Sequence, residues 1–100
     1  MNFYALDCAN ISSQADFWTL YLETVKPEGA QYFGCNLDAL WDAFSDGGPG
    51  WPGACQIDLM NVSSLQAIND GKFYLNLQSL ARELEQLTPS AEVFLKFPVK

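Results

Sequence analysis

Three short stretches of the chain concentrate aliphatic and aromatic side chains, and they predict β-strands. They are residues 3–8, 54–60 and 91–97. Runs of this length, bounded by turn-forming residues, are typical of strands. Longer stretches with a helical pattern separate them, so each strand is joined to the next by a helical crossover. Strands joined in that way pair in parallel, with right-handed connections.

Between the first two strands, apolar residues recur three or four positions apart, which is the spacing of a buried helix face. The first such helix opens at the capping sequence Ser13-Gln14-Ala15-Asp16 and ends near Val25, before Pro27. The second follows Asn36, whose side-chain oxygen suits the helix N-cap because it can accept from an early backbone amide. This second helix is predicted over residues 37–46.

Two further helices are predicted between the second and third strands. Asn61 is the expected cap of a short helix over residues 62–70, which ends at Gly71. The last helix runs over residues 73–87 and stops before Pro89. The pattern as a whole predicts an α/β fold: a small three-stranded parallel sheet packed by about four helices.

The helix over residues 37–46 divides its side chains into an apolar and a polar face. The apolar face comprises Leu37, Leu40, Trp41 and Phe44, and the polar face comprises Asp38, Asp42, Ser45 and Asp46. Asp38 and Asp42 are four residues apart, so their carboxylates are neighbours and repel each other by roughly a few tenths of a kcal/mol. No Lys or Arg in the segment compensates them. The pattern fits an ordinary solvated face or a surface that binds a basic partner.

A turn-rich break follows this helix. Residues 46–53 are rich in Gly and Pro, and the break is too short to link two domains. It also contains Trp51, a large aromatic residue that we expect to be exposed there. Two interpretations are open: the ring folds back as a lid on the core, or it contacts a partner, since Trp is enriched in interface hot spots.

Length and charge narrow the class of protein. One hundred residues predict a single domain over residues 1–100. A hydrophobic share of 49% against a charged share of 17% favours a packed globule over a disordered tail. The net charge of −7 and the pI of about 4.1 disfavour nucleic-acid and anionic-membrane partners and suit a basic protein partner.

The reactive residues exclude several kinds of chemistry. The chain has no His, which removes the common zinc sites and the His-dependent catalytic triads. Cys8, Cys35 and Cys55 are odd in number and widely spaced, so we expect free thiols. The first residues lack a basic region and a long apolar core, so no signal peptide is predicted, and no apolar run approaches transmembrane length. We therefore expect a cytoplasmic protein.

Residues 32–42, Tyr-Phe-Gly-Cys-Asn-Leu-Asp-Ala-Leu-Trp-Asp, closely resemble the barstar family motif Tyr-Tyr-Gly-x-Asn-Leu-Asp-Ala-Leu-Trp-Asp. Members of that family are intracellular protein inhibitors of a secreted bacterial ribonuclease. The resemblance implies the same three-stranded parallel fold and an inhibitor that needs no cofactor. Outside residues 32–42 the agreement lies in the order of the elements. The Gly/Pro-rich loop before Trp51 is longer than in the family.

The resemblance implies a partner-binding site that consists of Asp42, Asp38, Trp41, Tyr32, Gly34, Asn36 and Glu83. In this scheme Asp42 enters the phosphate site of the nuclease and dominates binding, and Asp38 pairs with a second basic group. A glutamate of the last helix contributes in the family. The apolar spacing favours Glu83 for that position and leaves Glu85 as the alternative.

The remaining site residues have supporting roles in the same scheme. Tyr32 and Gly34 shape the loop, and Gly34 allows a sharp turn or the close approach of a partner. Asn36 caps the helix and also touches the partner. Trp41 lies at the margin between core and interface.

Parts of the sequence are also compatible with functions other than inhibition. An enzyme using Asp38 and Asp42 as an acid–base pair would need a pocket and further catalytic groups, which the sequence does not show. A metal site would need more oxygen ligands than two Asp on one helix. A barstar-like module that binds a protein other than a nuclease is the closest alternative, because a fold does not fix its partner. The free protein is expected to be a monomer.

Overall fold

The computed structural model describes residues 2–87 and 92–98, and in that part of the chain three strands form one sheet with four α-helices. The elements in chain order are β1 (Asn2–Asp7), α1 (Gln14–Val25), η1 (Ala30–Tyr32), α2 (Leu37–Asp46), β2 (Cys55–Met60), α3 (Ser63–Gln66), η2 (Ile68–Gly71), α4 (Lys72–Glu85) and β3 (Val93–Lys96). All pairings are parallel, in the order β1-β2-β3. The predicted α/β fold is confirmed.

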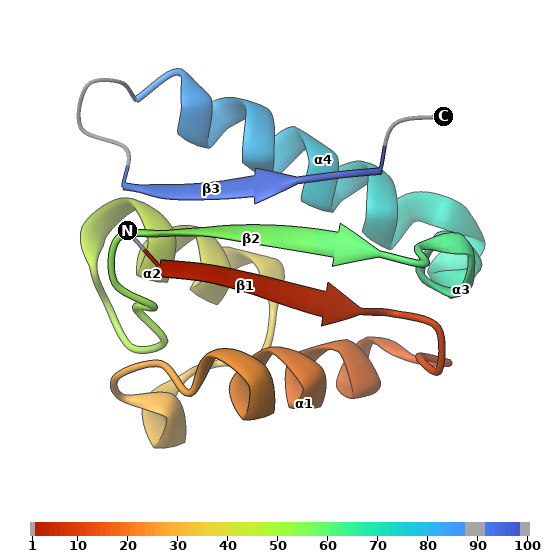
Figure 1. Cartoon of the computed structure of the whole chain (residues 1–100), viewed down its shortest axis with the longest axis horizontal. Coiled ribbons are helices and arrows are strands. Elements are labelled where there is room, and N and C mark those ends of the chain that lie inside the picture. The colour runs from red at the N-terminus through yellow and green to blue at the C-terminus, as the bar shows by residue number, and fades with distance from the viewer. Residues whose placement is uncertain (1, 88–91, 99–100) are drawn as a thin grey trace.

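The helices cover one face of the sheet. Leu6 and Leu59 pair across β1 and β2, and Ile57 and Leu95 pair across β2 and β3; all four side chains are buried. The alternate positions face away from this core, and Phe3 is 68% exposed. Figure 1 shows α1 beside β1, α4 beside β3 and α2 behind the strands, with no helix in front of them. α2 and α4 therefore pack against each other on the same side of the sheet.

Aromatic rings fill the space between α1 and the rest of the core. Trp18 of α1 lies 5.7 Å, centroid to centroid, from both Phe33 and Phe73, with the rings in edge-to-face arrangements. Phe17 meets Phe73 at 5.3 Å in the same geometry. Such pairs add to the burial energy of each ring. The three aromatic residues of α1, Phe17, Trp18 and Tyr21, are thus part of the core.

Two predicted helix caps are confirmed and one is wrong. The Ser13 hydroxyl accepts from the Asp16 amide at 3.2 Å, and the Asn36 side chain accepts from the Ala39 amide at 2.7 Å. Asn61 instead adopts a left-handed conformation, and its amide group donates to the Asp7 carboxylate at 2.8 Å. It joins the ends of β1 and β2, so α3 starts without a side-chain cap.

The predicted helix over residues 62–70 is also wrong, because it is divided. α3 covers only Ser63–Gln66 and is followed by the 3-10 turn η2. Asn69 and Asp70 both have positive φ, a conformation that Asn and Asp tolerate better than other side chains and that breaks an α-helix.

The boundaries near the C-terminus differ slightly from prediction. α4 ends at Glu85, two residues before Leu87, and β3 covers Val93–Lys96 within the expected residues 91–97. The predicted stop before Pro89 and the first residue of the expected strand lie outside the described residues. Within residues 2–87 and 92–98, no helix combines the length and apolar character needed to cross a membrane.

Trp51 is half-buried against the core and not exposed as expected. It forms an isolated antiparallel bridge with Glu28, so the Gly/Pro-rich loop runs back toward the start of the segment that precedes α2. Of the two interpretations of this residue, the lid on the core agrees with its position.

We predict that Leu40→Ala lowers the free energy of unfolding by about 2–5 kcal/mol, because Leu40 is 1% exposed and its loss leaves a cavity. Urea denaturation measures the change. Leu75→Ala is the matched control on α4: that side chain is 61% exposed, so the change should stay within about 0.5 kcal/mol. Equal effects of the two substitutions would show that the helical register of α2 is wrong.

We also predict that one thiol of three reacts in the native protein. Cys35 is exposed, whereas Cys8 and Cys55 are buried. Burial raises the pKa of both buried thiols to about 11, with the charge of Asp7 as a second cause at Cys8. Thiol titration at pH 8 should label Cys35 alone, and unfolding without reductant should expose all three.

The same shifts predict a loss of stability in alkali. A raised pKa favours the neutral thiol in the folded state, so its contribution is complete below the ordinary value of 9.0 and is lost as pH approaches 11. Denaturation midpoints should therefore fall over this range. Native labelling of either remaining thiol, Cys8 or Cys55, in the Cys35→Ser variant would contradict the assigned burial.

Candidate protein-binding site

The segment before α2 places one aromatic side chain in the core and its neighbour in solvent. η1 is a single turn in which the Tyr32 amide donates to the Gly29 carbonyl at 2.8 Å. The chain becomes extended at Phe33, which is buried between α1 and the loop after α2. Tyr32 is 74% exposed as a consequence. The tyrosine is thus held outward by the burial of the next residue.

The entry into α2 is built by Gly34, Cys35 and Asn36. Of the two roles open for Gly34, the sharp turn belongs instead to Cys35, whose φ is +52°. A Cβ on Gly34 would lie 3.1 Å from the Cβ of Ala39, so this glycine serves the close approach of the loop to its own helix. Asn36 connects the loop to α2, because its amide group donates to the Gly34 carbonyl while its side-chain oxygen caps the helix.

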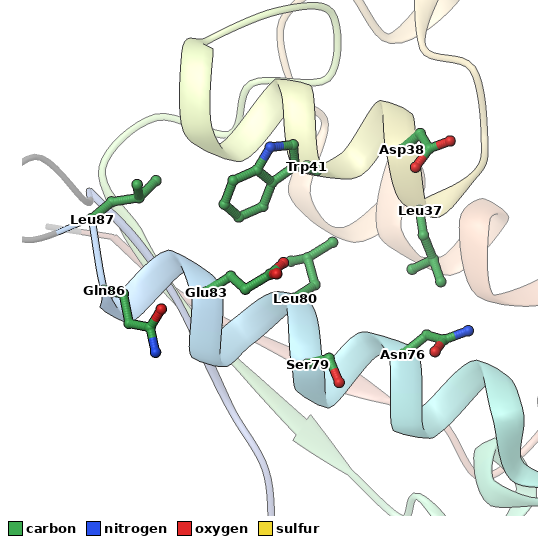
Figure 2. Close-up of a pocket in the computed structure, with 9 residues that line it drawn as sticks. All are labelled: Leu37, Asp38, Trp41, Asn76, Ser79, Leu80, Glu83, Gln86 and Leu87. Atoms are coloured by element: carbon green, nitrogen blue, oxygen red, sulfur yellow. The ribbon is translucent and has the colours of Figure 1, made fainter.

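A groove of about 700 Å³ lies between α2 and α4, along the surface where the two helices meet. The lining residues are Leu37, Asp38 and Trp41 from α2, and Asn76, Ser79, Leu80, Glu83, Gln86 and Leu87 from α4 and the turn after it. Figure 2 shows Trp41 and Leu37 pointing from α2 toward α4, with Glu83 lying across from the indole ring. The apolar floor and the two carboxylates, Asp38 and Glu83, give the groove a mixed character.

The structure brings part of the predicted site together. Asp38, Trp41 and Glu83 share the groove, although they come from helices separated by a strand in sequence. Glu85 is exposed elsewhere and does not line it. Asp42 is exposed one turn along α2 from Asp38 and lies outside the groove.

Leu37 and Trp41 are less buried than the predicted apolar face required. Leu40 and Phe44 are buried, and Ala43 joins them, but Leu37 and Trp41 are only partly covered. They sit where the core side of α2 opens into the groove. These two apolar side chains are therefore available for contact.

Of the residues that α4 contributes to the groove, the sequence pattern predicts only Glu83 as a site residue. Asn76, Ser79, Leu80, Gln86 and Leu87 also line the groove. They recur every three or four residues, the spacing of one stripe along a helix. That stripe was the available signal, but only the packing of α4 against α2 shows that it faces another element.

α2 lies in a long stretch of the chain that has acidic but no basic residues. No Lys or Arg occurs between Lys26 and Lys72, whereas Asp38, Asp42 and Asp46 all lie in α2. On α4 the Arg82 guanidinium donates to the Ser79 hydroxyl at 3.3 Å. The side chains of α2 therefore carry three negative charges and no positive one, which attracts a cationic surface and repels nucleic acid.

The acidic side chains do not gather into a metal site in the described part of the chain. Across residues 2–87 and 92–98, no group of three or more Cys, Asp or Glu side chains is arranged to hold a metal ion. Asp38 and Asp42 are both exposed, and only Asp38 reaches the groove. The exposed carboxylates, the outward tyrosine and the open groove suit contact with another protein.

One protein family matches nearly the whole chain. The family model described as "Barstar (barnase inhibitor)" matches residues 1–97 of the chain. A comparison with curated proteins finds no match. The family match covers every element of the fold and both helices of the groove. The chain belongs to the barstar family.

Proposed function

We propose that the chain inhibits a barnase-like ribonuclease by inserting the acidic side of α2 and the preceding loop into the nuclease active site. The observation that carries the proposal is the group of exposed carboxylates on α2, a helix whose own sequence contains no Lys or Arg. Asp38 and Glu83 line the groove from two different helices, and Asp42 extends the charge along α2. The family, described as one of barnase inhibitors, supplies the class of partner.

The mechanism follows from charge geometry. A ribonuclease holds the phosphate of its substrate with basic side chains, and a carboxylate can take the place of the phosphate oxygens. Arg–carboxylate pairs are charge-assisted and often bidentate, so they are strong and directional. Opposite charges also accelerate encounter. Faster encounter and strong coupling between close charge pairs are both known from the barstar–barnase pair itself, so they support the proposal by analogy.

Each site residue has a distinct part in this proposal. Asp42 occupies the phosphate site and Asp38 pairs with a second basic group. Tyr32 supplies an outward aromatic contact, and Trp41 supplies the apolar floor beside Glu83. Gly34 and Asn36 hold the loop against α2, and the exposed Asn36 also touches the partner.

The protein is proposed to act as a cytoplasmic monomer without a cofactor and without catalysis. Its role in a bacterial cell would be that of an immunity protein or an antitoxin. The competing possibility is a barstar-fold module with a non-nuclease partner. It is distinguished by direct binding, because a non-nuclease partner would leave barnase unbound and uninhibited.

We predict that Asp42→Ala separates binding from stability. The substitution should leave the free energy of unfolding unchanged or slightly raised, because it removes repulsion with Asp38. It should weaken binding to barnase by about 2–5 kcal/mol, since the basic groups of the partner lose their counter-charge in a desolvated site. Asp38→Ala should weaken binding less. Calorimetric titration and urea denaturation of the same variants measure both quantities.

Glu23→Ala is the control for long-range charge. Glu23 is an exposed acid on α1, away from the groove, so its removal should slow association modestly and more strongly at low salt. Asp16 is unsuitable for this purpose because its carboxylate accepts from the Ser12 amide and hydroxyl at the start of α1. If Asp42→Ala strongly destabilised the protein but left its affinity for barnase unchanged, the acidic residues of α2 would have a structural role and not a binding role.

A second pair of variants tests the contribution of α4. Glu83→Gln should weaken binding by about 1.5–3 kcal/mol, the range for a hydrogen bond to a charged group. Glu85→Gln removes the same charge from the same helix at a position outside the groove, so its effect should be small. Surface plasmon resonance with immobilised barnase compares the two. A larger loss for Glu85→Gln would place the contact on the other side of α4.

A further inference from the structure

The loop over residues 47–52 contacts the C-terminal part of α2 and also the chain that precedes α2. At its start, Gly47 and Gly48 donate to carbonyls at the C-terminus of α2, and Gly48 does so to Asp42. Further on, the loop pairs with Glu28 in two hydrogen bonds: the Glu28 amide donates to the Trp51 carbonyl at 3.1 Å, and the Gly50 amide donates to the Glu28 carbonyl at 2.8 Å. One short loop thus connects the end of α2 to the chain that precedes it.

Gly50 lies at the centre of these contacts. A Cβ at this position would lie 2.6 Å from Cδ1 of Phe33, so the glycine backbone packs directly on the phenylalanine ring. The Gly50 carbonyl accepts from the buried Tyr21 hydroxyl of α1 at 2.6 Å. Tyr21 also contacts Phe33, with ring centroids 5.8 Å apart. Phe33 is therefore held between α1 and the loop.

The position of Phe33 decides the position of its neighbours. Tyr32 and Gly34 flank it in sequence, and Tyr32 points outward while Phe33 is buried. A shift of the Phe33 ring must move residues 32–36, and with them the exposed tyrosine and the cap of α2. The contacts of the loop therefore act on the segment that carries the proposed interface.

We propose that the 47–52 loop is a brace for residues 32–36, and that Tyr21 and Gly50 are positioning residues which keep this segment in its binding conformation. The inference rests on the proposed function for its consequence in binding, but the mechanical coupling is independent of any partner. A segment that is already ordered loses less entropy on association, so the brace raises affinity without touching the nuclease.

Two glycine substitutions isolate the contact with Phe33. Gly50→Ala and Gly53→Ala both place a side chain at positive φ, +94° and +79°, so both carry the same kind of backbone strain. A Cβ at Gly53 meets nothing within 4 Å, whereas a Cβ at Gly50 meets Phe33. The difference between the two variants is therefore the displacement of that ring.

Tyr21→Phe is the second, gentler variant. It removes one hydroxyl and leaves the ring in the core, so the Gly50 carbonyl loses its buried partner. The loss of such a hydrogen bond is expected to increase local opening about tenfold. This variant keeps the proposal testable if Gly50→Ala does not fold.

Hydrogen exchange provides the test without a partner. The amides of Tyr32 and Phe33 donate within η1, and the Cys8 amide donates to Met60 in the sheet, far from the loop. In Gly50→Ala or Tyr21→Phe, exchange at Tyr32 and Phe33 should accelerate about tenfold beyond any change at Cys8. Gly53→Ala should alter all three amides equally. Equal acceleration at all three in Tyr21→Phe would overturn the brace, because the effect would then be global stability.

Binding to barnase provides the second arm. If only about a tenth of the molecules keep the binding conformation, affinity falls about tenfold. We expect that loss for Gly50→Ala relative to Gly53→Ala. If exchange in the variants accelerates more at Tyr32 and Phe33 than at Cys8, but the wild-type protein does not bind barnase, the brace is supported and the proposed function is overturned. The opposite result is tight binding by the wild-type protein, equal affinities for the two glycine variants, and no faster exchange at Tyr32 and Phe33 than at Cys8. It would overturn the brace and support the proposed function.

Discussion

The burial of Phe33 is the contact on which the arrangement of the site depends. Its ring packs against Trp18 and Tyr21 of α1 and against the backbone of Gly50. Burying a phenylalanine side chain contributes about 1.5–3 kcal/mol, which is enough to fix the path of a short loop. The chain on either side is thereby pinned at one point, and Tyr32 is left in solvent.

α2 can carry uncompensated charge because its other side is well packed. Repulsion between Asp38 and Asp42 costs roughly a few tenths of a kcal/mol, whereas burial of Leu40 and Phe44 contributes about 1.5–3 kcal/mol for each side chain. The Asn36 cap and the position of Asp38 in the first turn add further support. The helix therefore keeps its acidic face although its own sequence contains no Lys or Arg, and that face can bind the cations of a partner.

Local patterns were sufficient for most of the fold. The periodicity of α1 and α2, together with Ser13 and Asn36, located both helices because each pattern agrees with the backbone hydrogen bonds it requires. Asn61 was assigned wrongly since the same side chain can cap a helix or bond across the sheet, and only the position of Asp7 selects the second.

The site was less accessible to sequence reasoning than the fold. The resemblance supplied its residues, but the groove exists only because α2 and α4 pack on the same face of the sheet. Glu83 and Glu85 differ by two positions on one helix, and their separation into groove and solvent needs the rotation of α4. The contact between Gly50 and Phe33 joins residues 17 positions apart through a turn that no periodic pattern describes.

The central claim is that this surface blocks the active site of a ribonuclease. The most direct measurement is a titration of barnase activity with the purified chain, using nuclease at a concentration well above the dissociation constant. If the chain inhibits the nuclease, activity should fall linearly to zero at one chain per nuclease and recover when high salt screens the charges. Full ribonuclease activity at a large excess of the chain, in low salt, would contradict it.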